Sequence, residues 1–357
     1  GKLPLDGIRL LGAAIAPDGT RVAGLTANRS VRIWERDGNG FRDQWVDAEI
    51  ASATHFAFSQ DGTSLFTGDI SGGIYAFDAE TGRFQRMIKG LPPANDAHAD
   101  YVSAAAFLQD GRTLATASGD ATIKLWDVVS GDVVMTIPAA HEDRHAGWIT
   151  DLVLSADDKT IVSSSADGTV KVWDLKTGTL KSLLAGHDGV IQAIALSPDG
   201  VTLATAGRDS TIKLWNLAAG EVEHTLTGHE EWVTDVSFSP DGRILASSAG
   251  DNTVKLWDII EHKAQHTLEG HQGWVSAVDF SPGGQTLASA GEDATVRLWQ
   301  VGTGMELMTL RNGLDFAPNA IAFSDDGTLL AAAGNNALGG QVRLWHAPHV
   351  EPRDTKQ

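Results

Sequence analysis

Short apolar runs separated by polar turns follow one another along almost the whole chain. Around Trp257 the pattern predicts four successive strands, at Trp232–Ser239, Ile244–Ser248, Thr253–Trp257 and Gln265–Leu268. The runs are rich in β-branched and aromatic residues and are too short for helices. Asp241-Gly242 separates the first two runs, and Asp-Gly in this position is a strong hairpin signal because glycine accepts positive φ. We therefore expect antiparallel β structure built from four-stranded units.

The same unit recurs at a nearly constant period. A tryptophan ends the third predicted strand at Trp126, Trp173, Trp215, Trp257 and Trp299, with spacings of 47, 42, 42 and 42 residues. Trp34, Phe77 and Trp345 extend the series in both directions, which gives eight copies. A repeat of about 40–45 residues is typical of one supersecondary unit copied around a ring or along a stack. Radial stacking would bury faces that a single small sheet cannot bury alone.

Three polar positions recur at fixed distances before that tryptophan. A histidine lies 28 residues before it, a serine or threonine ten before it, and an aspartate six before it. The five complete sets are His98, Thr116, Asp120 and Trp126; His145, Ser163, Asp167 and Trp173; His187, Thr205, Asp209 and Trp215; His229, Ser247, Asp251 and Trp257; and His271, Ser289, Asp293 and Trp299.

Together with Gly186-His187, Gly228-His229 and Gly270-His271, these sets resemble the WD-repeat β-propeller family in its bacterial form. The resemblance covers nearly the whole chain and implies that each set is a buried, hydrogen-bonded tetrad. The donors and acceptors of indole, hydroxyl, imidazole and carboxylate can satisfy one another. Serine, histidine and aspartate also form hydrolase triads, but five copies that each include a tryptophan favour a structural role. We expect no catalytic residue.

The predicted fold is an all-β propeller of eight four-stranded blades, and seven blades plus a degenerate unit is the alternative. The outer copies depart from the pattern; the first, for example, has Gly24 where the others have a hydroxyl. We expect residues 1–346 to form a single domain. An N-terminal strand at Lys2–Leu5 would complete the last blade and close the ring, and residues 347–357 would form a polar tail.

Composition limits the classes of partner that we expect and adds little about the fold. The net charge of −19 argues against nucleic acid or an anionic membrane as the main partner, since both favour basic patches. No apolar run is long enough to span a membrane. Cysteine is absent, which excludes disulfides and thiolate metal sites and leans weakly toward a periplasmic or other extracytoplasmic location. The first residue is Gly1, which suggests a processed or excised chain.

The resemblance implies that loops at one mouth of the ring bind a partner. Aromatic residues lie three positions after four tetrad histidines, and polar residues lie near them on the same loops. The predicted partner-binding residues are Tyr101, Trp148, Gln192, Arg208, Trp232, Thr234, Trp274, Ser276 and Glu292. Aromatic residues and arginine are enriched at binding hot spots. The alternative is that each ring packs over the edge of its own blade.

We interpret the chain as a non-catalytic scaffold that presents a rigid face to a protein or peptide. One competing hypothesis is an enzyme or cofactor carrier with a small molecule or metal in the central channel, and another is a docking or sensing module of a larger fusion protein. An inserted loop holds His141, Glu142 and Asp143, but without ligand-defining spacing we expect no metal and no cofactor. The oligomeric state is left open.

Overall fold

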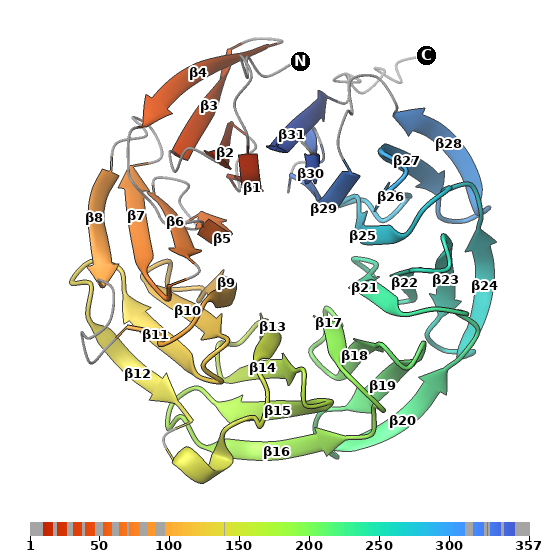
Figure 1. Ribbon diagram of the computed structural model, residues 1–357. Coiled ribbons are helices and arrows are strands. Elements are labelled where there is room, and N and C mark those ends of the chain that lie inside the picture. Colours follow the sequence, from red (N-terminus) through yellow and green to blue (C-terminus); the bar gives the residue numbers. More distant parts are fainter. Residues whose placement is uncertain are drawn as a thin grey trace, which may run out of the picture.

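Eight small antiparallel sheets stand around a central channel in the computed structural model (Figure 1). The structure describes residues 10–16, 20–26, 31–37, 40–46, 53–58, 64–69, 71–78, 84–89, 97–138, 140–310, 317–324, 327, 329–336 and 339–346. The predicted all-β propeller is therefore confirmed. We call the sheets blades 1 to 8 in chain order.

The strand bounds follow the repeat. Blade 1 holds β1 (Leu10–Ile15), β2 (Arg21–Thr26), β3 (Val31–Asp37) and β4 (Gly40–Val46); blade 2 holds β5 (Ala53–Phe58), β6 (Ser64–Asp69), β7 (Ile74–Asp78) and β8 (Phe84–Lys89). Blade 3 holds β9 (Val102–Phe107), β10 (Thr113–Ser118), β11 (Ile123–Asp127) and β12 (Val133–Ile137); blade 4 holds β13 (Ile149–Leu154), β14 (Thr160–Ser165), β15 (Thr169–Asp174) and β16 (Leu180–Ala185). A short 3-10 helix, η1 (His141–Asp143), joins these two blades.

The remaining blades repeat the plan. Blade 5 holds β17 (Ile191–Leu196), β18 (Thr202–Gly207), β19 (Ile212–Asn216) and β20 (Glu221–Leu226); blade 6 holds β21 (Val233–Phe238), β22 (Ile244–Ala249), β23 (Val254–Asp258) and β24 (Lys263–Leu268). Blade 7 holds β25 (Val275–Phe280), β26 (Thr286–Gly291), β27 (Thr295–Gln300) and β28 (Met305–Leu310); blade 8 holds β29 (Ala317–Phe323), β30 (Leu329–Asn336) and β31 (Gly339–His346).

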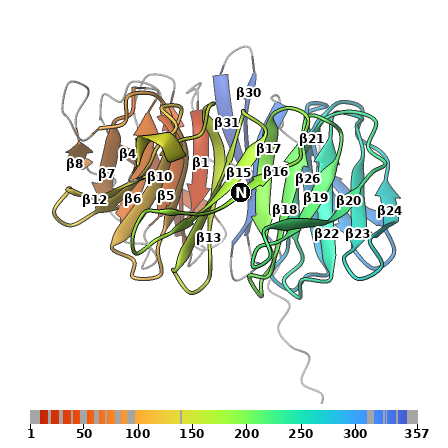
Figure 2. The ribbon, with the colours of Figure 1, turned by 90° about the horizontal axis from the view of Figure 1, so that it is seen from below.

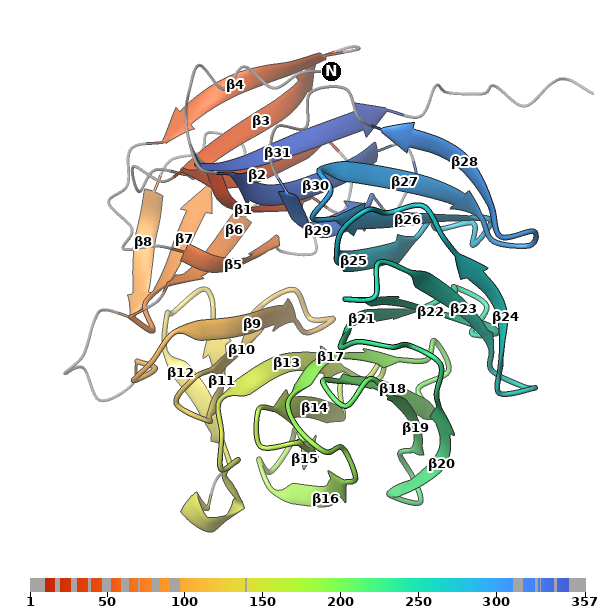
Figure 3. The same cartoon turned by 45° about the vertical axis from the view of Figure 1, so that its right-hand side comes forward.

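In each blade the strands pair with their neighbours in chain order, and the first strand lines the channel (Figure 1). The ring is closed by packing of β1 against β30 and β31, which lie beside blade 1 in Figure 3. The predicted closing strand at Lys2–Leu5 and the predicted tail at 347–357 lie outside the described residues.

The core lies between the blades. Second strands such as β10, β14, β18, β22 and β26 are buried along nearly their whole length and consist mostly of small residues. Small side chains suit a strand that is covered on both faces, because neighbouring sheets pack about 10 Å apart. Larger residues from the first and third strands complete each interface, and the outer strands face solvent (Figure 2).

Blade 1 shows the cost of an incomplete repeat. The side chain of Trp34 is fully buried, yet its indole Nε1 has no hydrogen-bond partner among the residues that the structure describes. In blades 3 to 7 the matching indole donates to a serine or threonine on the second strand. Blade 1 has Gly24 at that position, so the acceptor is missing. A buried donor without a partner costs about 1–3 kcal/mol.

The change Gly24→Ser should therefore raise the free energy of unfolding by about 1 kcal/mol, because its hydroxyl can accept from Trp34 Nε1. Urea denaturation followed by tryptophan fluorescence would measure the change. Gly24→Ala is the matched control, since it adds the Cβ without the hydroxyl. Equal stabilisation by both substitutions would contradict the hydrogen-bond explanation.

Candidate functional site

Each of the five complete residue sets forms a continuous chain of hydrogen bonds in blades 3 to 7. The indole Nε1 donates to the serine or threonine Oγ at 2.8–2.9 Å. The same Oγ lies 2.6–2.9 Å from histidine Nε2. Histidine Nδ1 lies 2.8–3.2 Å from the aspartate. The hydroxyl on the second strand thus links the third strand to the loop that enters the blade.

The five hydrogen-bonded tetrads are too deeply buried to react directly with a substrate. The histidine side chains are at most 1% exposed and the aspartates at most 14% exposed. Burial lowers the pKa of His98, His187 and His271, which favours the neutral ring. Burial alone would raise the pKa of Asp120, but hydrogen bonds from its histidine, a threonine and the backbone outweigh burial and lower it. A hydrolase would need an accessible hydroxyl, and these five are buried.

A further threonine, not predicted from the sequence, belongs to each of these hydrogen-bond networks. Thr122, Thr169, Thr211, Thr253 and Thr295 each donate to the tetrad aspartate at 2.6–2.8 Å. The backbone N–H after each histidine donates to the same carboxylate. The signal was an Asp-x-Thr triplet in each of the five complete copies, and the middle residue of all five triplets has positive φ. The aspartate therefore holds two loops together at one mouth of the ring.

The two loops that each tetrad aspartate holds together carry the predicted partner-binding residues. The residue three after each histidine accepts a backbone hydrogen bond from the residue before the tetrad aspartate. The five pairs are Tyr101–Gly119, Trp148–Ala166, Val190–Arg208, Trp232–Gly250 and Trp274–Glu292, at 2.8–3.0 Å. Each of blades 3 to 7 therefore places two residues side by side at what we call the mouth face.

Three adjacent blades combine their side chains into one row on the mouth face. Arg208 of blade 5 donates from Nε to Gln192 Oε1 at 3.1 Å. The Arg208 guanidinium lies 4.4 Å from the ring centroid of Trp232 in blade 6. The rings of Trp232 and Trp274 meet edge to face, 5.7 Å apart. Both indoles remain exposed, at 36% and 41%. We call Gln192, Arg208, Trp232 and Trp274 the mouth row.

The other predicted residues lie outside this row. Tyr101 packs over its own blade, since a Cβ on Gly119 would lie 2.6 Å from its ring. Trp148 of blade 4 is 49% exposed. The Thr234 hydroxyl lies 2.8 Å from Ser248 Oγ and donates to the Val275 carbonyl of the next blade, so it is engaged inside the ring. Ser276 is half-buried and Glu292 is exposed.

Acidic side chains surround the mouth row. Asp188, Glu230, Glu231 and Glu292 are exposed on the loops of blades 5 to 7. Arg208 is held against Gln192 and Trp232 within that acidic field. Aromatic rings with a carboxylate rim suit a ligand that is apolar in part and positively charged in part.

The inserted loop between blades 3 and 4 lies on the outer edge of the ring, where η1 projects in Figure 1. Lys171 Nζ donates to the carbonyls of Asp143 and Arg144 and fixes the loop to blade 4. The described residues contain no cluster of three or more potential metal ligands. No helix among them is long and apolar enough to cross a membrane.

Carboxylates from the first strands link neighbouring blades at the channel. Oδ2 of Asp151 accepts the N–H of Ile194 at 3.1 Å, and Oδ2 of Asp235 accepts that of Val278 at 3.0 Å. Burial raises the pKa of Asp151 to about 6, and burial together with nearby Asp151 and Asp279 raises that of Asp235 to about 7. These residues were not predicted from the sequence, because only the packing of one blade against the next brings each carboxylate to its partner.

The family is established by comparison with known proteins. The family model described as "WD domain, G-beta repeat" matches residues 93–127, 136–174, 178–216, 220–258, 262–300 and 307–346, which together exceed half of the chain. The chain belongs to this WD40 repeat family. Over nearly its full length it also superposes on the computationally designed Ika8 protein, with a TM-score of 0.79, 26% identity and coverage of 97% of this chain and 98% of the other.

Similarity to curated proteins is confined to parts of each sequence. A WD repeat-containing protein SL1-17 from Schistosoma mansoni is 39% identical over 22% of this chain and 24% of its own length. A guanine nucleotide-binding protein subunit beta from Solanum tuberosum is 28% identical over 31% of this chain and 29% of its own length. WD repeat-containing protein 1 from Rattus norvegicus is 36% identical over 23% of this chain and 13% of its own length. The chain thus spans less than a third of these relatives.

The channel carboxylates should make stability rise as the pH falls. The folded-state pKa of Asp235, about 7, lies above the value of about 3.9 in an unfolded chain, so the folded protein binds more protons. Stability from this group should increase by about 2 kcal/mol between pH 8 and pH 5, a value reduced because the Asp235 side chain is partly exposed. Urea denaturation at several pH values would measure the slope of the free energy of unfolding against pH.

Asp235→Asn should flatten that slope, because the amide keeps an acceptor for Val278 and carries no charge. Asp151→Asn should flatten it less, since the pKa of Asp151 is about 6. A slope that is identical in wild-type protein and in both variants would show that these groups titrate normally in the folded state.

Proposed function

We propose that this chain is a non-catalytic interaction scaffold that binds a protein or peptide through the mouth row. The observation that carries the proposal is the contact of Arg208, Trp232 and Trp274 across three blades while both indoles stay exposed. Large exposed rings that are already ordered lose little conformational entropy on binding, and this favours their use as anchors.

The family supports the same reading. WD40 propellers generally act as scaffolds, and one relative is by name a subunit of a guanine nucleotide-binding protein. The acidic rim favours a partner with basic groups. A bacterial origin, an extracytoplasmic location and a place within a larger fusion protein stay predictions, as does the list of contact residues beyond the mouth row.

The double variant Trp232→Ala with Trp274→Ala should abolish partner capture, with at least a tenfold loss of recovered partner, because it removes both anchors. Affinity capture from the source cells followed by quantitative mass spectrometry would measure the loss. The matched control is Met305→Ala with Met308→Ala, which removes two exposed apolar side chains from the outer strand β28.

Both double variants should keep the melting temperature of the wild-type protein, since all four side chains are exposed. Undiminished capture by the tryptophan variant would contradict binding at the mouth row. Elemental analysis and the absorbance spectrum of the purified protein test the competing cofactor hypothesis, which a stoichiometric metal or chromophore would favour.

A further inference from the structure

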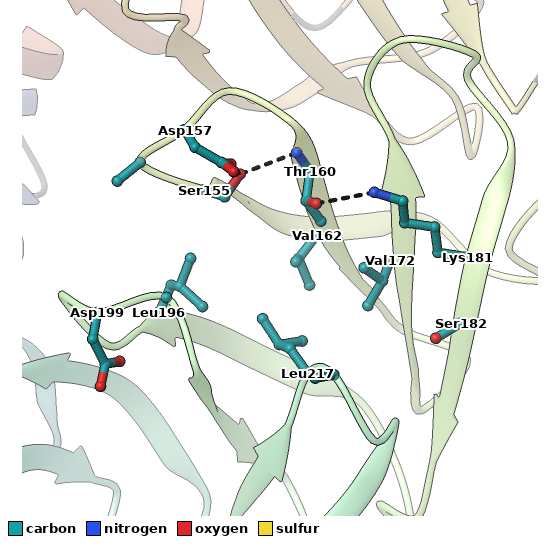
Figure 4. A pocket seen from close by; sticks show the side chains of 13 residues that line it. Ser155, Asp157, Thr160, Val162, Val172, Lys181, Ser182, Leu196, Asp199 and Leu217 are labelled. Carbon is teal, nitrogen blue, oxygen red and sulfur yellow. Dashed lines mark hydrogen bonds between the residues drawn. The ribbon is translucent and has the colours of Figure 1, made fainter.

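A pocket of about 520 Å³ opens between blades 4 and 5, away from the mouth face (Figure 4). First strands begin at the mouth face and run to the turn that joins them to the second strand. The pocket is lined by two of these turns, around Asp157 and Asp199, and so lies at the opposite face. Its volume falls in the range of about 300–1,000 Å³ that is usual for ligand sites.

The pocket exists partly because one outer-strand residue is small. Strand pairing makes Met135, Ser182, His224 and His266 equivalent, since each lies opposite the same position of its third strand. Met135 and His266 fill their junctions: a Cβ on Gly178 would lie 3.0 Å from Met135 Sδ, and one on Gly304 would lie 2.8 Å from His266.

The equivalent position is also filled between blades 5 and 6, but it is open between blades 4 and 5. The ring of His224 stacks on that of His262 with centroids 3.3 Å apart, so the junction between blades 5 and 6 is also filled. Between blades 4 and 5, a Cβ on Gly220 would lie 3.7 Å from Ser182 Oγ. Serine leaves space where methionine or histidine packs elsewhere.

A second position leaves space at the same junction. Pro198, Pro240 and Pro282 each contact the turn glycine of the following blade, within 3.3–3.5 Å of where its Cβ would stand. Blade 4 has Ala156 in place of proline, and a Cβ on Gly200 would meet no atom within 4 Å. Two independent departures from the repeat therefore fall at one junction and produce one pocket.

The pocket floor is apolar. Val162, Val172, Leu196 and Leu217 line it; the two valines belong to the core cluster between blades 4 and 5, and the two leucines pack against that cluster. In Figure 4 the side chains of these residues face the space between the two blades. Burial of an aliphatic or aromatic side chain against this floor would be favourable, because it removes apolar surface from water.

The charges on the rim are unbalanced. Lys181 pairs with Asp174 at 3.2 Å, and Lys159 pairs with Asp157 at 2.9 Å. Asp199 accepts hydrogen bonds from Ser197 Oγ and the N–H of Val201, and no basic side chain pairs with it within the described part of the chain. The hydrogen bond from Ser197 lowers the pKa of Asp199, so this exposed carboxylate is ionised at neutral pH.

We propose that the pocket between blades 4 and 5 is a second binding site, which takes a peptide segment with one aliphatic or aromatic side chain beside a lysine or arginine. The apolar side chain fills the space above Val162, Val172 and Leu196, and the basic group pairs with Asp199. This site is separate from the mouth row and does not depend on the function proposed for it.

A phage-displayed random peptide library provides the test. The library is panned on the full wild-type chain after counter-selection on Ser182→Met, which places the residue of blade 3 at this position. We expect surviving peptides to share an apolar residue next to a basic one. Their synthetic versions are then measured by fluorescence anisotropy.

Ser182→Met and, separately, Ala156→Pro should weaken binding about tenfold or more because each fills the pocket. Ser182→Ala is the matched control and should stay within about twofold, since it leaves the space open. Asp199→Asn should weaken binding about threefold or more and reduce its dependence on salt. Trp232→Ala with Trp274→Ala should leave it unchanged.

Each opposite result overturns the proposal. If no peptide in the library binds the wild-type protein more tightly than the Ser182→Met variant, the space is a packing defect and not a binding site. Peptides that lack a basic residue would show that Asp199 plays no part. Peptides that lose affinity in the tryptophan variant would be ligands of the mouth row and not of this pocket.

Discussion

One buried hydroxyl in each complete blade holds the rest of the structure in place. It accepts from an indole on the third strand and bonds to an imidazole in the loop that enters the blade, while the second strand that carries it is buried on both faces. Polar groups in such a place are stable only when they are paired. Satisfying them fixes the loop, and the loop fixes the side chains at the mouth.

The repeat explains the rigidity of the ring, and the departures from it explain where the two proposed binding sites lie. Trp232 and Trp274 meet because two neighbouring blades both carry an indole three residues after the tetrad histidine. The pocket on the other face arises because Ser182 and Ala156 replace larger residues at one junction. A propeller built from identical blades would offer every site as many times as it has blades. Within the described residues of this chain, each proposed site occurs at one place on the ring.

Carboxylates serve this acidic chain in three settings that differ in their electrostatics. Tetrad aspartates receive several hydrogen bonds, which outweigh burial and lower the pKa. The channel aspartates Asp151 and Asp235 receive fewer, and burial raises the pKa. Asp199 is exposed and ionised, so it can attract a basic group. The same side chain thus stabilises loops, couples blades or, at the second site that we propose, faces a ligand according to its surroundings.

The sequence by itself determined the local unit. The tryptophan period, the Asp-Gly turns and the spacing of His98, Thr116, Asp120 and Trp126 specified the strands and their order, because strand pairing within a blade involves residues close in the chain. The same spacing placed Trp232 and Trp274 at one mouth. Thr122 and its equivalents were visible as Asp-x-Thr triplets, but their bonds to the aspartates were not anticipated.

Only the tertiary structure decided what lies between blades. The contact of Arg208 with Trp232, the linkage of Asp151 to Ile194 and the space beside Ser182 each join residues of different repeats. Their geometry depends on how far each blade is rotated against the next, and that rotation follows from the packing of all side chains at the junction. Periodicity along the chain specifies which residues face a junction, whereas the volumes that meet there decide whether it is filled, bonded or open.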